Sequence, residues 1–230
     1  MALIYFFRHG QAGTRDDYDR LSPLGQRQAR LLGEWIARQG LQFDTILCGG
    51  LRRQQETAAL ALPEAARIDP GWSEFDLDAV YAQIAPQLAA VDSGFRAHWE
   101  ELQRSIASGD DGIHRRWTPP DAAVVEAWIR GRFPTEAESW AGFNERVRGA
   151  GAHFAGLPDT ARVAVFTSAT PISIWVSEVL GGLGADRTMR FAGASLNTAM
   201  TILSARAGRL DLFTFNSVPH LEDQALHTFR

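Results

Sequence analysis

The sequence predicts an α/β fold, a three-layer α/β/α sandwich built around a mostly parallel sheet. Three short apolar runs, at residues 3–7, 43–48 and 161–167, are typical of buried strands. Each run is followed by a turn and then by a segment with the apolar spacing of a helix. We expect one domain over residues 1–230, with an inserted helical cap at about 77–133.

The composition limits the kinds of protein that this chain can be. Its 230 residues are 45% hydrophobic and 22% charged, which is ordinary for a globular protein. A net charge of −4 argues against nonspecific binding to nucleic acid or to anionic membranes. The single cysteine cannot form an internal disulfide, and neither a secretory leader nor an apolar run of about 18 residues occurs. These observations predict a cytoplasmic protein with no nucleic-acid or membrane partner.

The first apolar run ends abruptly in Arg8, His9 and Gly10. In an α/β sheet, ligands bind in the crevice beyond the carboxyl ends of the strands. Gly10 lets the backbone turn closely, Arg8 offers a fork of donors for an oxyanion such as phosphate, and His9 can act as a nucleophile or proton carrier. A strand that merely finishes in polar residues would carry the same side chains, so these three positions alone leave both interpretations open.

A second candidate anion site follows the second predicted strand. Gly49 and Gly50 form a turn ahead of a predicted helix, and such a turn exposes backbone N–H groups and the positive end of the helix dipole. Arg53, in the first turn of that helix, can reach the same phosphate as Arg8. Arg52 points about 100° away around the helix and is expected to be solvated.

The motifs, taken together, resemble those of the histidine phosphatase superfamily, which is also called phosphoglycerate-mutase-like. Arg8-His9-Gly10-Gln11-Ala12 is similar to the first motif of that family. Residues 46–58 are similar to its second strand, turn and Arg-x-x-Gln-Thr-Ala helix, with Arg53 at the second arginine. The resemblance is thin over residues 77–133 and continues at residues 21–29, 72–76, 138–139, 163–172 and 216–221.

The resemblance implies a metal-independent phosphomonoesterase that needs no cofactor and acts on a small phosphorylated metabolite. His9 would attack phosphorus while Glu74 protonates the leaving oxygen, and water would then hydrolyse the phosphohistidine. Arg8 and Arg53 would hold the phosphate. Asp76 is the alternative acid, because the continuation that usually follows the family's acid is missing here.

One position departs from the family pattern. Ser168, in Thr167-Ser168-Ala169-Thr170, stands where the family has its second catalytic histidine. A serine can donate one hydrogen bond to a phosphoryl oxygen but brings no positive charge, and losing such a donor typically costs about 10²- to 10³-fold in rate. A weak or inactive member that binds a phosphorylated ligand is therefore one alternative. A phosphoglycerate-type mutase is another, although the Trp-Asn that follows the mutases' first motif is absent.

Further substrate contacts are predicted in the loop after the first strand, from Gln11, Arg15 and Arg20. The alternative is that the two arginines pair with the loop's own acids, Asp16, Asp17 and Asp19. In the predicted cap, a basic and aromatic group is either a substrate contact or a solvated turn; its members are His98, His114, Arg115, Arg116 and Trp117.

Three other reactive side chains are expected to be structural. His153 lies near a predicted helix C-terminus, where positive charge is favoured. His220 belongs to a closing motif that resembles the family's. Cys48 lacks the arginine that cysteine phosphatases place six residues after their nucleophile, so we expect a buried strand-end cysteine.

Overall fold

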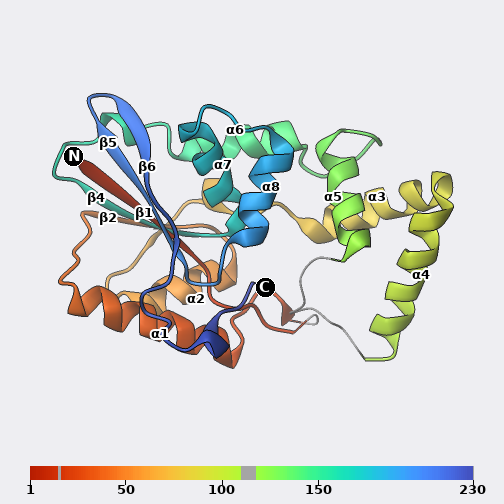
Figure 1. Ribbon diagram of the computed structural model, residues 1–230, viewed down its shortest axis with the longest axis horizontal. Helices are drawn as coiled ribbons and strands as arrows, with labels where there is room; N and C mark the ends of the chain where they lie inside the picture. Colours follow the sequence, from red (N-terminus) through yellow and green to blue (C-terminus); the bar gives the residue numbers. More distant parts are fainter. Residues whose placement is uncertain (15–16, 110–117, 230) are drawn as a thin grey trace. The chain divides into compact units, whose positions relative to one another are not determined.

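The computed structural model describes residues 1–14, 17–109 and 118–229 (Figure 1). It confirms the predicted α/β fold. The chain divides into two compact units: unit 1 comprises Met1–Glu74 and Arg146–Arg230, and unit 2 comprises Phe75–Glu145.

Unit 1 contains a mixed sheet that is mostly parallel. Its described strands run in the order β3-β2-β4-β1-β5-β6. The pairs β3–β2, β2–β4 and β4–β1 are parallel, whereas β1–β5 and β5–β6 are antiparallel and include the C-terminal hairpin. The strands are β1 (Ala2–Arg8), β2 (Thr45–Cys48), β3 (Arg67–Ile68), β4 (Arg162–Thr167), β5 (Met200–Arg206) and β6 (Arg209–Ser217).

Helices cover both faces of this sheet, which gives the three predicted layers (Figure 1). Helices α1 (Pro23–Arg38) and α2 (Arg52–Ala61) pack together on one face, and α7 (Ala169–Val179) with α8 (Ala185–Ala194) lies on the other. Helix α1 begins with residues that favour a helix N-terminus. The Ser22 side chain caps the helix by accepting a hydrogen bond from the Gly25 amide, and Pro23 is the first helical residue.

Strand β1 is buried on both faces because its side chains alternate between them. Tyr5 and Phe7 belong to the cluster that α1 and α2 cover. On the other face, the ring of Phe6 lies 5.7 Å from that of Trp72 and 6.1 Å from that of Phe154. Trp72 ends the short 3₁₀ helix Pro70–Trp72, so this aromatic packing anchors the segment that leads to Glu74.

Unit 2 is helical in the part that the structure describes. Its helices α3, α4 and α5 each begin after a side chain that caps the first turn, namely Asp76, Asp92 and Thr118. Helix α6 begins in this unit and ends in unit 1. The bounds are α3 (Leu77–Val91), α4 (Ser93–Ala107), α5 (Pro119–Ile129) and α6 (Trp140–Ala150).

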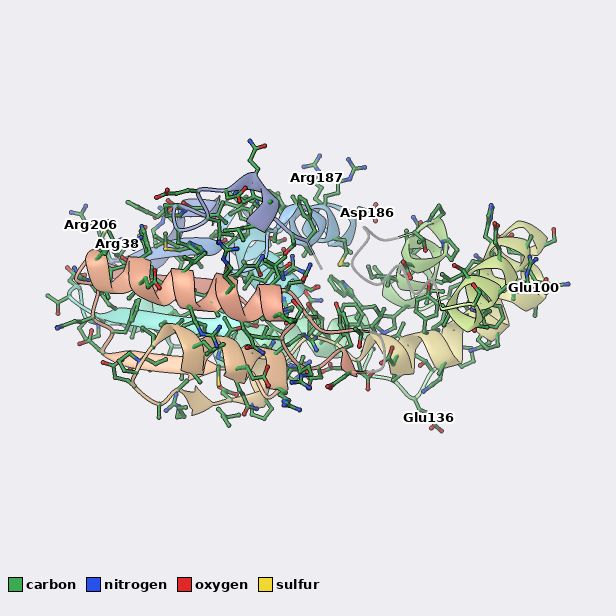
Figure 2. All side chains as sticks on the ribbon, turned by 90° about the horizontal axis from the view of Figure 1, so that it is seen from below. Arg38, Glu100, Glu136, Asp186, Arg187 and Arg206 are labelled. Atoms are coloured by element: carbon green, nitrogen blue, oxygen red, sulfur yellow. The ribbon has the colours of Figure 1, made fainter. Side chains whose placement is uncertain are left out.

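Charged side chains lie on the surface of unit 1, as Figure 2 shows for Arg38, Asp186, Arg187 and Arg206. They point away from the sheet and its covering helices. Among the charged residues of unit 1 that the structure describes, the exceptions are Arg8 and Arg53, which are both buried. Burying a guanidinium is costly unless it is paired, so these two positions mark the part of unit 1 where function is to be sought.

No helix in residues 1–14, 17–109 or 118–229 combines the length and the hydropathy needed to cross a bilayer.

Candidate active site

The sheet brings the predicted site residues of unit 1 to one edge. Strands β1 and β4 are parallel neighbours, with Arg8 opposite Thr167 at their carboxyl ends. His9 and Ser168 therefore leave the sheet side by side, although 159 positions separate them in the chain. Strand β2 ends beside β4, and α2 then carries Arg53 to the same edge.

The backbone around His9 is held from three sides. Its amide donates to the Thr167 carbonyl at 2.9 Å, and its carbonyl accepts from Nδ2 of Asn197 at 3.0 Å. The next residue, Gly10, passes so close to α1 that a Cβ on it would lie 2.5 Å from the Gly25 carbonyl oxygen. Position 10 therefore requires glycine, which has no side chain. The close approach of the Gly10 backbone to α1 sets the position of His9 beyond the end of β1.

The hydrogen bonds of the His9 ring identify its tautomer. Nε of Arg53 lies 3.3 Å from Nε2 of His9, and Nδ1 of His9 lies 2.7 Å from the Gly10 carbonyl oxygen. An arginine nitrogen only donates and a carbonyl oxygen only accepts. Nδ1 therefore carries the hydrogen, and Nε2 presents its lone pair.

The surroundings of His9 also keep the ring uncharged. Burial lowers the pKa of His9 well below its ordinary value, and the charges of Arg53 and then Arg8 lower it further, against a smaller opposing effect of the Gly10 hydrogen bond. The imidazole is therefore neutral at pH 7. A neutral ring with no hydrogen on Nε2 has the form that a nucleophile requires.

Arg53 contacts a carboxylate of its own chain. Its Nη1 lies 2.7 Å from Oδ1 of Asp19, while Oδ2 of Asp19 accepts from the backbone amide of Arg52 at 3.0 Å. The Tyr18 ring lies against the same guanidinium, with its centre 5.3 Å from Cζ. An acidic side chain thus lies at the N-terminus of α2, where the sequence predicts a phosphate.

Arg8 is buried at the end of β1 and contacts main-chain oxygens. Its Nη1 donates to the carbonyl of Ser195, and its Nη2 donates to the carbonyl of Phe229 at 2.6 Å. These contacts come from segments far along the chain. A phosphate-binding role for Arg8 stays a prediction.

Ser168 and Glu74 lie near the first turn of α7. Ser168 is buried and its Oγ accepts from Nε2 of Gln54 at 2.8 Å. Oε2 of Glu74 accepts from the backbone amide of Thr170 at 3.1 Å. The structure thus brings the predicted acid within two residues of the position that departs from the family pattern. Asp76, the alternative acid, is exposed and caps α3 through the Ala79 amide at 2.9 Å.

The predicted loop contacts have partners within the protein. Oε1 of Gln11 accepts from the Ser22 hydroxyl at 2.8 Å. Arg20 is exposed and pairs with Asp17 at 3.0 Å, which is the solvated alternative. Arg15 lies outside the described residues, as do His114, Arg115, Arg116 and Trp117.

The other reactive side chains have surroundings typical of structural residues. His153 is exposed. His220 is buried with Nε2 2.9 Å from the Thr198 hydroxyl, and burial, with a smaller effect of His227, lowers the pKa of His220 to about 4. Burial raises the pKa of the Cys48 thiol, which disfavours the thiolate that a nucleophile would need.

Sequence reasoning missed two residues of this site, Asp19 and Gln54. Asp19 was counted only among the loop acids, because nothing in a charged loop shows which arginine it will contact. Gln54 gave no signal beyond its place in the first turn of a helix.

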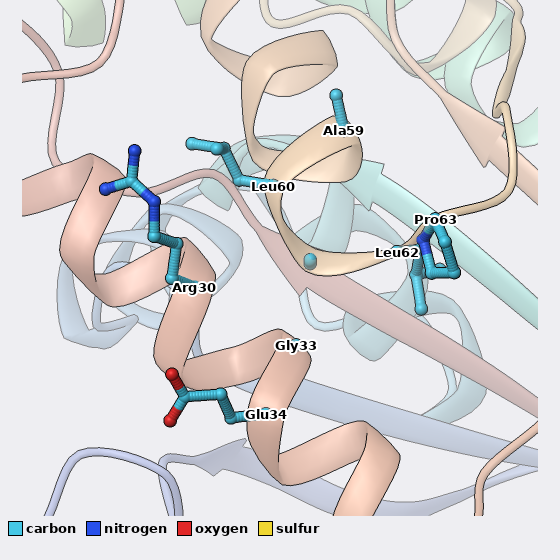
Figure 3. Close-up of a pocket in the computed structure, with 8 residues that line it drawn as sticks. Arg30, Gly33, Glu34, Ala59, Leu60, Leu62 and Pro63 are labelled. Atoms are coloured by element: carbon cyan, nitrogen blue, oxygen red, sulfur yellow. The ribbon is translucent and has the colours of Figure 1, made fainter.

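A pocket with a volume of about 410 Å³ lies between α1 and the end of α2 (Figure 3). Leu60, Leu62 and Pro63 lie opposite Arg30 and Glu34. It shares no residue with the predicted site. Among the described residues, no three histidine, cysteine or acidic side chains lie close enough to hold a metal ion.

Comparisons with known proteins identify the family of this chain. Residues 4–112 match the family model of the histidine phosphatase superfamily, branch 1. An uncharacterised protein of Picosynechococcus is 32% identical over 128 residues, which cover 48% of this chain and 76% of that protein. A 2,3-bisphosphoglycerate-dependent phosphoglycerate mutase of Methylorubrum populi is 41% identical over 71 residues, but the match spans 27% of this chain and about a third (32%) of the mutase. The chain belongs to the histidine phosphatase superfamily.

Solved structures share the fold over nearly the whole chain. A putative α-ribazole-5′-phosphate phosphatase of Escherichia coli has a TM-score of 0.65 at 19% identity, and the match covers 94% of this chain and 96% of that one. A variant of the phosphoserine phosphatase of Entamoeba histolytica, solved with phosphoserine, has a TM-score of 0.58 at 19% identity. That match covers 96% of this chain and 100% of the phosphatase chain. At such identities the likeness establishes the fold alone.

Replacing Arg53 tests the electrostatics of the site. In Arg53→Gln the pKa of His9 should rise, because a positive charge that disfavours the imidazolium is removed. The pKa of His220 should stay at about 4, because burial and His227 set it. A histidine-resolved NMR titration measures both, and His227→Gln is the reciprocal control, which should raise the pKa of His220 alone. A His9 pKa that does not move in Arg53→Gln would contradict this description.

Proposed function

We propose that the protein is a metal-independent phosphomonoesterase that hydrolyses a small phosphorylated metabolite through a phosphohistidine at His9. The observation that carries the proposal is the state of His9, a buried neutral imidazole whose Nε2 faces the buried guanidinium of Arg53 at the start of a helix. Membership of the histidine phosphatase superfamily supports the same reaction class.

The reaction proceeds in two displacements. Nε2 of His9 attacks phosphorus, the bond from phosphorus to the leaving oxygen breaks, and Glu74 gives its proton to that oxygen. Glu74, now a carboxylate, then takes a proton from water as the water oxygen attacks phosphorus. The phosphorus–nitrogen bond breaks, which releases inorganic phosphate and restores both residues.

The phosphate is held by donors from three elements. Arg8 ends β1, Arg53 lies in the first turn of α2, and Ser168 lies between β4 and α7. These donors neutralise charge that builds on the phosphoryl oxygens. The phosphate replaces Asp19 on Arg53, because both anions use the same guanidinium.

Two other functions remain candidates. A family member that binds a phosphorylated ligand with little or no turnover is favoured by Ser168, which brings no positive charge, and by Asp19, which already occupies Arg53. A mutase is favoured only by the partial similarity to the phosphoglycerate mutases. We further propose a cytoplasmic location and a substrate-selecting role for the cap at 77–133.

Removing the nucleophile tests the proposal. His9→Ala should lower turnover of the best substrate below about a hundredth of the wild-type rate, within the range that a single catalytic group supplies. The matched control is His153→Ala, which removes an exposed histidine and should leave turnover unchanged. The assay is phosphate release from a panel that includes phosphoserine, 3-phosphoglycerate and α-ribazole phosphate, with and without chelator.

Three outcomes of that assay would count against the proposal. Retention of more than about a hundredth of the wild-type rate in His9→Ala would remove His9 as the nucleophile. Activity abolished by the chelator would contradict metal independence. A wild-type protein that binds phosphomonoesters without releasing phosphate from any of them would establish the binding function instead.

Neutralising Asp19 tests whether its carboxylate competes with phosphate. Asp19→Asn should tighten the binding of inorganic phosphate by about 1.4- to 5-fold, because an ion pair with a half-exposed carboxylate is worth roughly 0.2–1 kcal/mol. Asp17→Asn removes the same charge from the same loop but from a residue paired with Arg20, so it should change the affinity less. Isothermal titration calorimetry measures both. Weaker binding in Asp19→Asn would mean that Asp19 holds Arg53 in place rather than competing with the ligand.

A further inference from the structure

Gln54 lies in the first turn of α2 with its side chain fully buried. Its Nε2 donates to Oγ of Ser168 at 2.8 Å and to the Trp72 carbonyl at 3.3 Å. Its Oε1 accepts from the Leu51 backbone amide at 3.2 Å. Both ends of the amide are therefore used.

These contacts also fix which way the amide faces. Exchanging its oxygen and nitrogen would place the oxygen against the Trp72 carbonyl and the NH₂ group against the Leu51 N–H, so both contacts would become repulsive. Gly49 provides the space, because a Cβ at that position would overlap Oε1 of Gln54. The direction of the hydrogen bond to Ser168 follows: Gln54 donates and Ser168 accepts.

This direction decides what Ser168 can do. A hydroxyl has one hydrogen, and its oxygen already accepts from Gln54. Ser168 occupies the N-cap position of α7, yet its side chain makes no capping hydrogen bond to that helix. No acceptor for its hydrogen is found in the part of the chain that the structure describes. The hydroxyl hydrogen is thus left to donate to a ligand.

We propose that Gln54 is a positioning residue that makes the Ser168 hydroxyl a donor to a phosphoryl oxygen. The inference rests on the proposed function, and it extends that function to a residue that touches no substrate. Gln54 and Ser168 together form a neutral donor pair at the position where the resemblance places a second histidine. Being neutral, this pair does not titrate near neutral pH, unlike a histidine.

The same geometry sets a steric limit at position 168. The amide of Gln54 lies at hydrogen-bond distance from Oγ, in space that a larger side chain extending from Ser168 toward α2 would need. Ser168→His alone should therefore be no faster than wild type. Combining it with Gln54→Ala removes the amide and should give a higher rate than Ser168→His.

A double-mutant cycle tests the positioning role. Ser168→Ala and Gln54→Leu should each lower kcat by about 10²- to 10³-fold with little change in KM, because each removes the same donor to charge that develops in the transition state. The double variant should be no slower than the slower single variant. A merely structural Gln54 would instead give effects that multiply.

An isosteric variant guards against failure of Gln54→Leu to fold. In Gln54→Glu a carboxylate replaces the donor, so the Ser168 hydroxyl turns its hydrogen toward α2 and away from the ligand. The kcat of Gln54→Glu should fall. The same substitution made in the Ser168→Ala background should lower kcat less, and the difference between the two losses measures the hydrogen bond to Ser168 apart from the effect of the added charge. Gln55→Glu is the matched control, since it makes the same change one residue along, where the side chain contacts the Gly50 carbonyl.

The outcomes separate this inference from the function on which it rests. If the wild type turns over no phosphomonoester, the proposed phosphatase fails and the same cycle is measured on vanadate binding, where non-additive losses would still support the Gln54–Ser168 pair. Multiplicative effects on either readout, or equal losses in Gln54→Glu and Gln55→Glu, would overturn the positioning role. A protein that binds neither vanadate nor phosphate would overturn both proposals.

Discussion

The site depends on one electrostatic constraint: an imidazole and two guanidiniums are buried at the same sheet edge. Three positive charges there would be unstable, because buried charges need partners. The protein avoids this by keeping His9 neutral, with Nε2 accepting from Arg53. The neutral form of His9 is thus a consequence of burial beside cations and requires no separate base to remove its proton.

The guanidiniums meet the same constraint by contacting internal oxygen atoms. Arg53 pairs with Asp19, and Arg8 donates to the carbonyls of Ser195 and Phe229. These oxygens neutralise or solvate the arginines. A dianionic phosphate would be a stronger partner than any of them. Under the proposed function, the affinity for phosphate is a difference between these two sets of contacts, and internal acids would set it as much as the arginines.

Sequence reasoning reached the parts of this account that local rules determine. The strand before Arg8 and the helix that begins after Ser22 follow from apolar spacing and capping. Parallel pairing then brings the ends of β1, β2 and β4 together, which made a joint site of His9 and Arg53 predictable. The contacts of Asp19 depend on an irregular loop path, and the Gln54–Ser168 hydrogen bond joins residues 114 positions apart, so neither has a local signal.

The central claim is that phosphate passes through a covalent bond to Nε2 of His9. The most direct measurement is rapid quenching of the wild type during turnover under alkaline conditions, followed by peptide mass spectrometry. The account predicts one phosphoryl group on the peptide that contains His9, stable in base, lost in acid, and formed and discharged at least as fast as the steady-state turnover. Turnover with this peptide unmodified, or with the phosphoryl group on another residue, would contradict it.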